Sequence, residues 1–149
     1  MKHLLYIYDD NSDLEETIKE SSLFEDIFFN YTHIDEFLKN PNRYIKQDSV
    51  LLLHLEDSFF NDIFKIAIPH ELTISFLPKK NQKNITNTYK LEKSLDLQFK
   101  NIVESKEHSV DIICIDNRSY ILNEIAFGEI PIFNSIQKQT IKDGFFSKS

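Results

Sequence analysis

Short runs of consecutive apolar residues, each followed by polar residues, constrain the fold of this chain more than any other feature. The clearest run, Ser49–Leu55 (SVLLLHL), has the length and aliphatic content of a strand that is buried on both faces of a sheet. Three further runs are read as strands in the same way: His3–Tyr8, Asp26–Tyr31 and Leu72–Leu77. Because parallel neighbours need long crossover connections, we expect helices between these strands.

Segments with a helical spacing of apolar residues do separate the runs. The predicted helices are one marked by Leu14, Ile18 and Leu23, then Ile34–Ile45 with an interruption at Pro41, then Phe59–Ile66, and finally Tyr89–Glu104. A regular alternation of strands and helices is typical of the α/β class. The sequence therefore predicts a doubly wound, mostly parallel sheet.

The end of the chain departs from this alternation. Val110–Ile115 and Tyr120–Phe127 read as two strands joined at Asp116–Arg118, which predicts a C-terminal β-hairpin. The polar tail Gln137–Ser149 is expected to be loosely held. Two organisations fit: a single α/β domain over residues 1–149, or one in which residues from about 110 to 149 begin a truncated second, β-rich domain.

Charge and hydropathy exclude several classes of protein. A formal net charge of −7 argues against a protein that binds nucleic acid through the phosphate backbone. No run approaches the roughly 20 apolar residues of a membrane span, and Leu4–Tyr8 is too short for a signal peptide. We therefore expect a cytoplasmic protein without a membrane span or a nucleic-acid partner.

Ligands of open α/β sheets bind outside the carboxyl ends of the strands, so site residues are sought there. Asp9, Asp10, Glu56 and Asp57 follow two of the predicted strands. Carboxylates at neighbouring strand ends are able to hold a hard cation, although helix caps and solvated turns use the same residues. His54, inside a predicted strand, is read as a hydrogen-bonded residue of the sheet face rather than a catalytic base.

Glycine is scarce, and this limits phosphate chemistry. The chain has two glycines, Gly128 and Gly144, and neither follows an early strand. Loops that cradle phosphates need glycine for close backbone approach, so a P-loop and a G-x-G-x-x-G turn are both excluded. The only tight basic cluster in the sequence consists of Lys79, Lys80 and Lys83, and we expect it to lie in a solvated loop.

Leu55–Ile63 (LEDSFFNDI) resembles the G-G-D-G-T-L-N-E-V segment of diacylglycerol kinase-like and NAD kinase-like proteins. Asp57 matches the Asp of that motif and Asn61 its Asn, while Asp62 stands for the Glu. The positions of the glycines are taken by Leu55, Glu56 and Ser58, and Phe59 replaces the Thr.

A second segment, Phe76–Asn84, is similar in placement to the family's L-P-x-G-T-x-N-D but keeps only Leu-Pro. Its remaining motif positions are occupied by Lys80, Asn81, Lys83 and Asn84. Further along the chain, three short segments resemble P-V-D, R-x-F-x-N and N-V-A-x-I-G of the family: Ser109–Asp111, Arg118–Asn123 and Asn123–Gly128. The order and spacing of the motifs fit from about Lys2 to Gly128.

The resemblance implies the N-terminal, nucleotide-binding α/β domain of such kinases, which normally precedes a β-sandwich. The nucleotide-contacting positions would be Asp57, Ser58, Asn61, Asn81, Lys83 and Asn84. Because side chains replace the family's glycines, no residue is assigned a catalytic role. We expect a domain that is inactive alone and acts in binding or regulation, with no cofactor. ATP and Mg²⁺ would enter only if residual activity as a lipid or NAD kinase-like phosphotransferase persists.

Two alternatives remain open. Tyr8–Leu14 resembles the opening of response-regulator receiver domains, in which Asp9, Asp10 and Asp57 would hold a divalent cation and Asp57 would accept a phosphoryl group. No Ser or Thr ends the fourth predicted strand, however, and no Lys-Pro follows a fifth. The other alternative is an interaction domain that binds a protein partner or self-associates through exposed aromatics: Phe133, Phe145 and Phe146.

Overall fold

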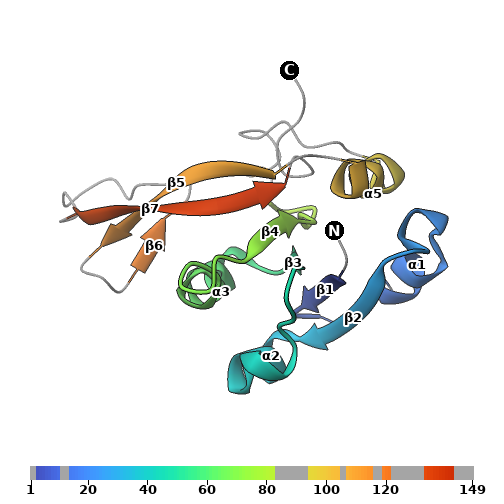
Figure 1. Cartoon of the computed structure of the whole chain (residues 1–149), viewed down its shortest axis with the longest axis horizontal. Coiled ribbons are helices and arrows are strands. Elements are labelled where there is room, and N and C mark those ends of the chain that lie inside the picture. Colours follow the sequence, from blue (N-terminus) through green and yellow to red (C-terminus); the bar gives the residue numbers. More distant parts are fainter. Residues whose placement is uncertain are drawn as a thin grey trace.

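The structure, a computed structural model, describes residues 3–10, 14–82, 94–104, 107–115, 119–121 and 133–142. Their strands form one sheet with the order β2-β1-β3-β4-β7-β5-β6 (Figure 1). The first four are parallel: β1 (His3–Tyr8), β2 (Phe28–His33), β3 (Ser49–His54) and β4 (Thr73–Phe76). The predicted α/β class with a parallel sheet is thereby confirmed.

Helices cover both faces of this parallel part (Figure 1). One face carries α1 (Leu14–Glu20), η1 (Ser22–Phe24) and α5 (Leu95–Glu104). The other face carries α2 (Ile34–Lys39), η2 (Pro41–Arg43), η3 (Asp57–Phe59) and α3 (Phe60–Ala67). Successive crossovers therefore run on opposite faces around β1, which makes the sheet doubly wound.

Side chains of the central strands alternate between two cores because successive residues of a strand point to opposite faces. Leu5, Leu51 and Ile74 pack under α2 and α3, whereas Leu4, Tyr6 and Leu52 pack under α1 and α5. All six are at most 1% exposed. Strands that are buried on both faces need continuous apolar runs, which explains why the sequence reveals β1 and β3 so clearly.

The boundaries of two predicted helices change for local reasons. The helix expected over Ile34–Ile45 ends at Lys39, because Pro41 begins a separate 3-10 turn. In the first helical stripe, Phe24 rather than Leu23 is buried, since the chain tightens into η1 after Glu20. In the described residues, α5 begins at Leu95, and residues 89–93 of the predicted helix Tyr89–Glu104 lie outside them.

Three later strands extend the sheet beyond β4: β5 (Glu107–Ile115), β6 (Ser119–Ile121) and β7 (Phe133–Lys142). β7 runs parallel to β4, and β5 runs antiparallel to both β7 and β6. The expectation of a loosely held tail is wrong from Gln137 to Lys142, which belong to β7. The hairpin turn predicted at Asp116–Arg118 lies outside the described residues, as do Phe145 and Phe146.

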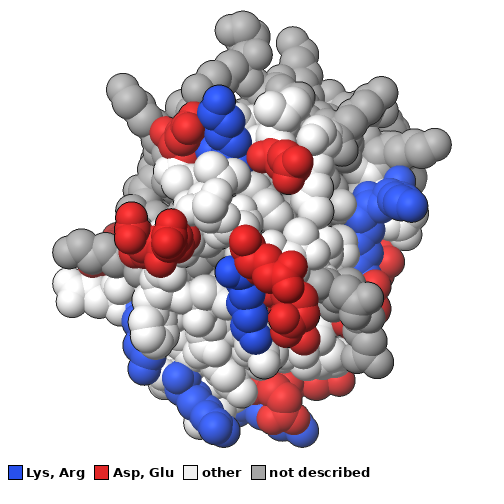
Figure 2. All heavy atoms as spheres, turned by 90° about the vertical axis from the view of Figure 1, so that its right-hand side faces the viewer, with Lys and Arg blue, Asp and Glu red and all other residues white. Residues whose placement is uncertain are grey.

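On the side that bears α1, β2 and α5, the charged side chains of the described residues are of both signs. Figure 2 shows acidic and basic side chains interspersed there, with uncharged surface between them. Ion pairs such as Lys19–Glu16, with the Lys Nζ 3.7 Å from Glu16 Oε1, contribute to this pattern. Among the described helices, none is long and apolar enough to cross a bilayer.

Candidate functional site at the carboxyl edge of the sheet

The carboxyl ends of three neighbouring strands bring charged residues together. Asp9 and Asp10 follow β1, Glu56 follows β3, and Lys79 follows β4. Because these strands are parallel and adjacent in the order β1-β3-β4, their carboxyl ends form one edge. The strand order reverses at β1, so this edge is the place where doubly wound folds bind ligands.

Lys79 is the centre of this edge. Its ammonium donates a hydrogen bond to Asp9 Oδ1 and another, of 3.0 Å, to Asp10 Oδ2, and it lies 3.7 Å from Glu56 Oε1. The side chain of Lys79 is 12% exposed and that of Asp9 only 7% exposed. Asp9 also accepts a 2.8 Å hydrogen bond from the backbone N–H of Glu56. A largely buried lysine is thus neutralised by surrounding carboxylates.

The contacts between Asp9 and Lys79 shift the pKa values of both side chains. Burial alone would raise the pKa of Asp9, but hydrogen bonds from Lys79 and from the Glu56 N–H outweigh it and lower that pKa. Burial alone would lower the pKa of Lys79, but its bonds to Asp9 and Asp10 raise it. Both side chains are therefore charged at neutral pH.

The loop Lys79–Gln82 is tied across the edge by further hydrogen bonds. Gln82, 5% exposed, donates to the Leu55 carbonyl and, at 2.8 Å, to Asp57 Oδ1. Its Oε1 accepts a 2.8 Å bond from the Lys79 N–H, and Asn81 Nδ2 lies 3.2 Å from Glu56 Oε2. Backbone and side-chain bonds therefore fix this loop against the residues that follow β3.

Two histidines support the edge from the strands beneath. The His54 Nδ1 atom donates a 2.7 Å bond to the Leu77 carbonyl, which holds the end of β4 to β3. The His33 Nδ1 atom accepts the Asp35 N–H at 3.1 Å and so caps α2, while Nε2 donates to the Asp9 carbonyl at 3.2 Å. A carbonyl only accepts and an N–H only donates, so these partners assign the tautomer of each ring.

The structure brings together only some of the residues singled out in the sequence. Asp57 and Asn81 lie at the same edge, joined to it through Gln82 and Glu56 respectively. Ser58 lies beside Asp57 in η3 and is exposed, and Asn61 lies half-buried in α3. Lys83 and Asn84 lie outside the described residues.

The expectation of a solvated lysine loop is wrong for Lys79. Its charge is held by Asp9 and Asp10, seventy and sixty-nine residues away in the sequence. Lys80, the next residue, is exposed. The available signal was the position of Lys79 directly after a strand-ending Pro78, at the edge where Asp9 and Asp10 were already expected.

The predicted cation site involves Asp9, Asp10 and Asp57. In the described part of the chain, no group of three or more His, Cys, Asp or Glu side chains has the arrangement of a metal site. Asp9 and Asp10 are bound to Lys79, and Asp57 is bound to Gln82.

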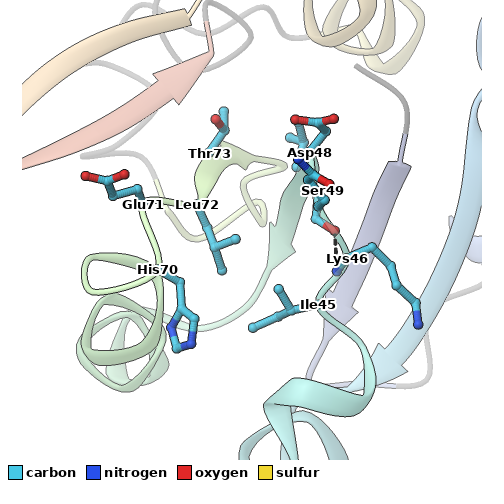
Figure 3. A pocket seen from close by; sticks show the side chains of 10 residues that line it. Ile45, Lys46, Asp48, Ser49, His70, Glu71, Leu72 and Thr73 are labelled. Carbon is cyan, nitrogen blue, oxygen red and sulfur yellow. Dashed lines mark hydrogen bonds between the residues drawn. The ribbon is translucent and has the colours of Figure 1, made fainter.

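A pocket among the described residues lies at the opposite edge of the sheet, away from these contacts. Its volume is about 570 Å³, and its lining residues precede or begin β3 and β4 (Figure 3). The lining consists of Ile45, Lys46, Gln47, Asp48, Ser49, Val50, His70, Glu71, Leu72 and Thr73. A dense polar network thus lies at the carboxyl edge, and this pocket lies at the amino edge.

No protein-family model matches the chain, and comparison with curated proteins and with solved structures gave no match either.

Proposed function

We propose that this chain is a non-catalytic binding or regulatory domain built on the nucleotide-binding α/β fold that its sequence resembles. One observation carries the proposal: the edge at which such folds bind ligands is closed by the ion pairs of Lys79 with Asp9 and Asp10. The resemblance to diacylglycerol kinase-like and NAD kinase-like proteins accounts for the fold. The loss of glycine at Leu55, Glu56 and Ser58 accounts for the absence of a phosphate cradle.

The charge at the closed edge opposes the binding of phosphates. Among the described residues, Lys79 is the cation that is paired there, and its charge is already met by Asp9 and Asp10, with Glu56 close by. Asp57 adds a further carboxylate beside Gln82. A nucleotide phosphate would approach several carboxylates and would have to break the Lys79 pairs to gain a counter-charge, at a cost that is large for partly buried ions.

Nucleotide titration tests this proposal. We expect no change in melting temperature when ATP or ADP is added at millimolar concentration with Mg²⁺, because a ligand stabilises a fold only when it binds it. The Asp57→Asn variant, which leaves Lys79 in place, should behave identically. A rise in melting temperature with ATP that disappears in Asp57→Asn would refute the non-catalytic proposal and favour a working nucleotide site.

A receiver-like phosphoacceptor is the second candidate, and the strand order favours it. The order β2-β1-β3-β4 places Asp9, Asp10 and Asp57 at one edge with a lysine among them. Such a domain would take a phosphoryl group on Asp57 with a divalent cation held by the acidic pair. Intact mass after incubation with acetyl phosphate and Mg²⁺ tests it: a single phosphoryl addition that Asp57→Asn abolishes would establish this function, and no addition would exclude it.

A further inference from the structure

The residues that line the pocket at the amino edge of the sheet take no part in the contacts at the carboxyl edge. It lies between the segment that enters β3 and the segment that joins α3 to β4, where the two strands diverge before their pairing starts at Val50 and Thr73. Its volume of about 570 Å³ falls in the range of roughly 300–1,000 Å³ that is usual for small-molecule sites.

The walls of this pocket differ in chemistry. Figure 3 shows the carboxylates of Asp48 and Glu71 at the upper rim, on either side of Thr73. The side chains of Ile45 and Leu72 extend into the space below that rim. A ligand that fits both walls carries a positive charge at one end and an apolar body at the other.

The basic residues of the lining do not neutralise this rim. Figure 3 shows the Lys46 side chain extending away from the pocket, with its ammonium far from both carboxylates. His70 lies on the lower side, where its Nδ1 donates a 2.9 Å hydrogen bond to the Ile66 carbonyl. Among residues 3–10, 14–82 and 94–104, whose side chains the structure describes, no ion pair of Asp48 or Glu71 occurs. Within that part of the chain, the rim is a negative region without a paired cation, and it lies above Ile45 and Leu72.

We propose that this pocket binds an alkylammonium ion, with the ammonium between Asp48 and Glu71 and the alkyl chain against Ile45 and Leu72. Charge attraction selects the sign of the head group, and each CH₂ of the alkyl chain that leaves water raises the affinity about fourfold. This ligand lies outside the proposed function, which concerns the opposite edge.

Matched five-carbon probes test the proposal on the full chain. We expect pentylammonium to raise the melting temperature by about 3–5 °C at ten times its dissociation constant. Pentanol, which lacks the charge, should act much more weakly, and pentanoate should give no rise. An equal rise with pentanol and pentylammonium would overturn the assigned head-group contact.

The double variant Asp48→Asn/Glu71→Gly separates binding from folding. Both positions have left-handed backbone, with φ of 64° at Asp48 and 53° at Glu71, which Asn and Gly tolerate better than the native residues. The variant should therefore be at least as stable as the native chain, so a loss of binding cannot come from unfolding. We expect its affinity for pentylammonium to fall at least tenfold.

A charge-matched control completes the experiment. Glu25→Gln/Asp26→Asn removes two exposed carboxylates in the turn before β2, away from the pocket-lining residues. This control should bind pentylammonium as the native chain does. Unchanged affinity in the pocket variant would show that the ammonium does not bind at this rim. An equal loss in the control would show that the ammonium responds to net charge and not to this pocket.

Discussion

At the scale of single residues, Glu71 occupies a backbone position that suits glycine. It follows α3 with φ of 53°, and the Leu72 N–H bonds to the Ala67 carbonyl at 2.9 Å, as in a Schellman helix ending. Left-handed backbone costs a residue with a Cβ about 1–2 kcal/mol. A chain with two glycines, neither of them here, accepts this cost at Glu71.

The variant Glu71→Gly is therefore expected to stabilise the fold by about 0.5–1 kcal/mol, after the greater freedom of glycine in the unfolded chain is subtracted. Urea denaturation gives the free energy of unfolding that checks this value. Glu71→Ala removes the same charge but keeps the Cβ, so it should give no comparable gain. Equal gains in the two variants would mean that the charge, and not the backbone, is responsible.

His3 couples stability to pH. It is 4% exposed, its Nδ1 lies 2.7 Å from Ser49 Oγ, and its Nε2 has no hydrogen-bond partner among the described residues. Burial, and then the charge of Lys46, lower the pKa of His3 below its ordinary 6.5. As pH falls below about 6.5, the unfolded chain takes up a proton that the folded chain resists, so stability falls.

The expected result is a lower urea midpoint at pH 5.5 than at pH 7.5, with a slope from His3 of at most about 1.4 kcal/mol per pH unit. The variant His3→Gln should flatten this slope, and Lys46→Gln should reduce it in part. A pH dependence that is the same in His3→Gln and in the native chain would place its origin in other groups.

At the scale of elements, the Lys79–Gln82 loop holds β4 to β1 and β3 through side chains rather than through an apolar anchor. Removing Lys79 would leave Asp9, 7% exposed, as an unpaired buried carboxylate. Breaking one side of a buried pair typically costs about 3–5 kcal/mol.

Lys79→Met is therefore expected to lower the free energy of unfolding by about 3 kcal/mol, measured by urea denaturation at pH 7. The control Lys80→Met makes the same substitution at the neighbouring lysine, which is exposed. Its free energy of unfolding should stay within about 0.5 kcal/mol of that of the native chain. Adding Asp9→Asn to Lys79→Met should restore part of the loss, since the unpaired charge is gone. If the two lysine variants were equally stable, the ion pairs would not hold the loop.

The elements that the sequence predicts well are those whose composition directly reflects their burial. β1 was predicted with its observed bounds, and β3 to within one residue, because strands buried on both faces must be apolar throughout. β7 was missed because Phe133–Lys142 is rich in polar residues. Its backbone pairs with β4 and β5, and the local sequence pattern does not show this pairing. The Lys79–Asp9 contact was missed for the same reason: residues 70 apart carry no shared local pattern.

At the scale of the whole molecule, the two edges of one parallel sheet have opposite character. The carboxyl edge, at the reversal of strand order, is filled by the ion pairs of Lys79. The amino edge keeps an open pocket between the approaches to β3 and β4. The residues that follow the strands in the sequence indicate the first edge, whereas Asp48 and Glu71 lie in no recognisable motif, so the sequence does not predict the pocket at the second.

The pairing of β4 with β7 joins two distant parts of the chain in one sheet. Thr140 pairs with Thr73 of β4 on one side and with Ser109 of β5 on the other, so it lies in a strand with neighbours on both sides. Proline at such a position removes a ladder hydrogen bond and is avoided in central strands. Thr140→Pro is therefore expected to destabilise the protein by about 2–4 kcal/mol.

The matched control is Ser119→Pro, at the first residue of β6, the last strand in the sheet order. Proline is tolerated at the first residue of a strand and at sheet edges, so this variant should lose no more than about 1 kcal/mol. Thermal unfolding followed by circular dichroism compares the two. If β5, β6 and β7 fold with the parallel strands as one unit, Thr140→Pro lowers a single transition that includes the helices. A helical transition left unchanged in Thr140→Pro would show instead that the parallel half folds without β7.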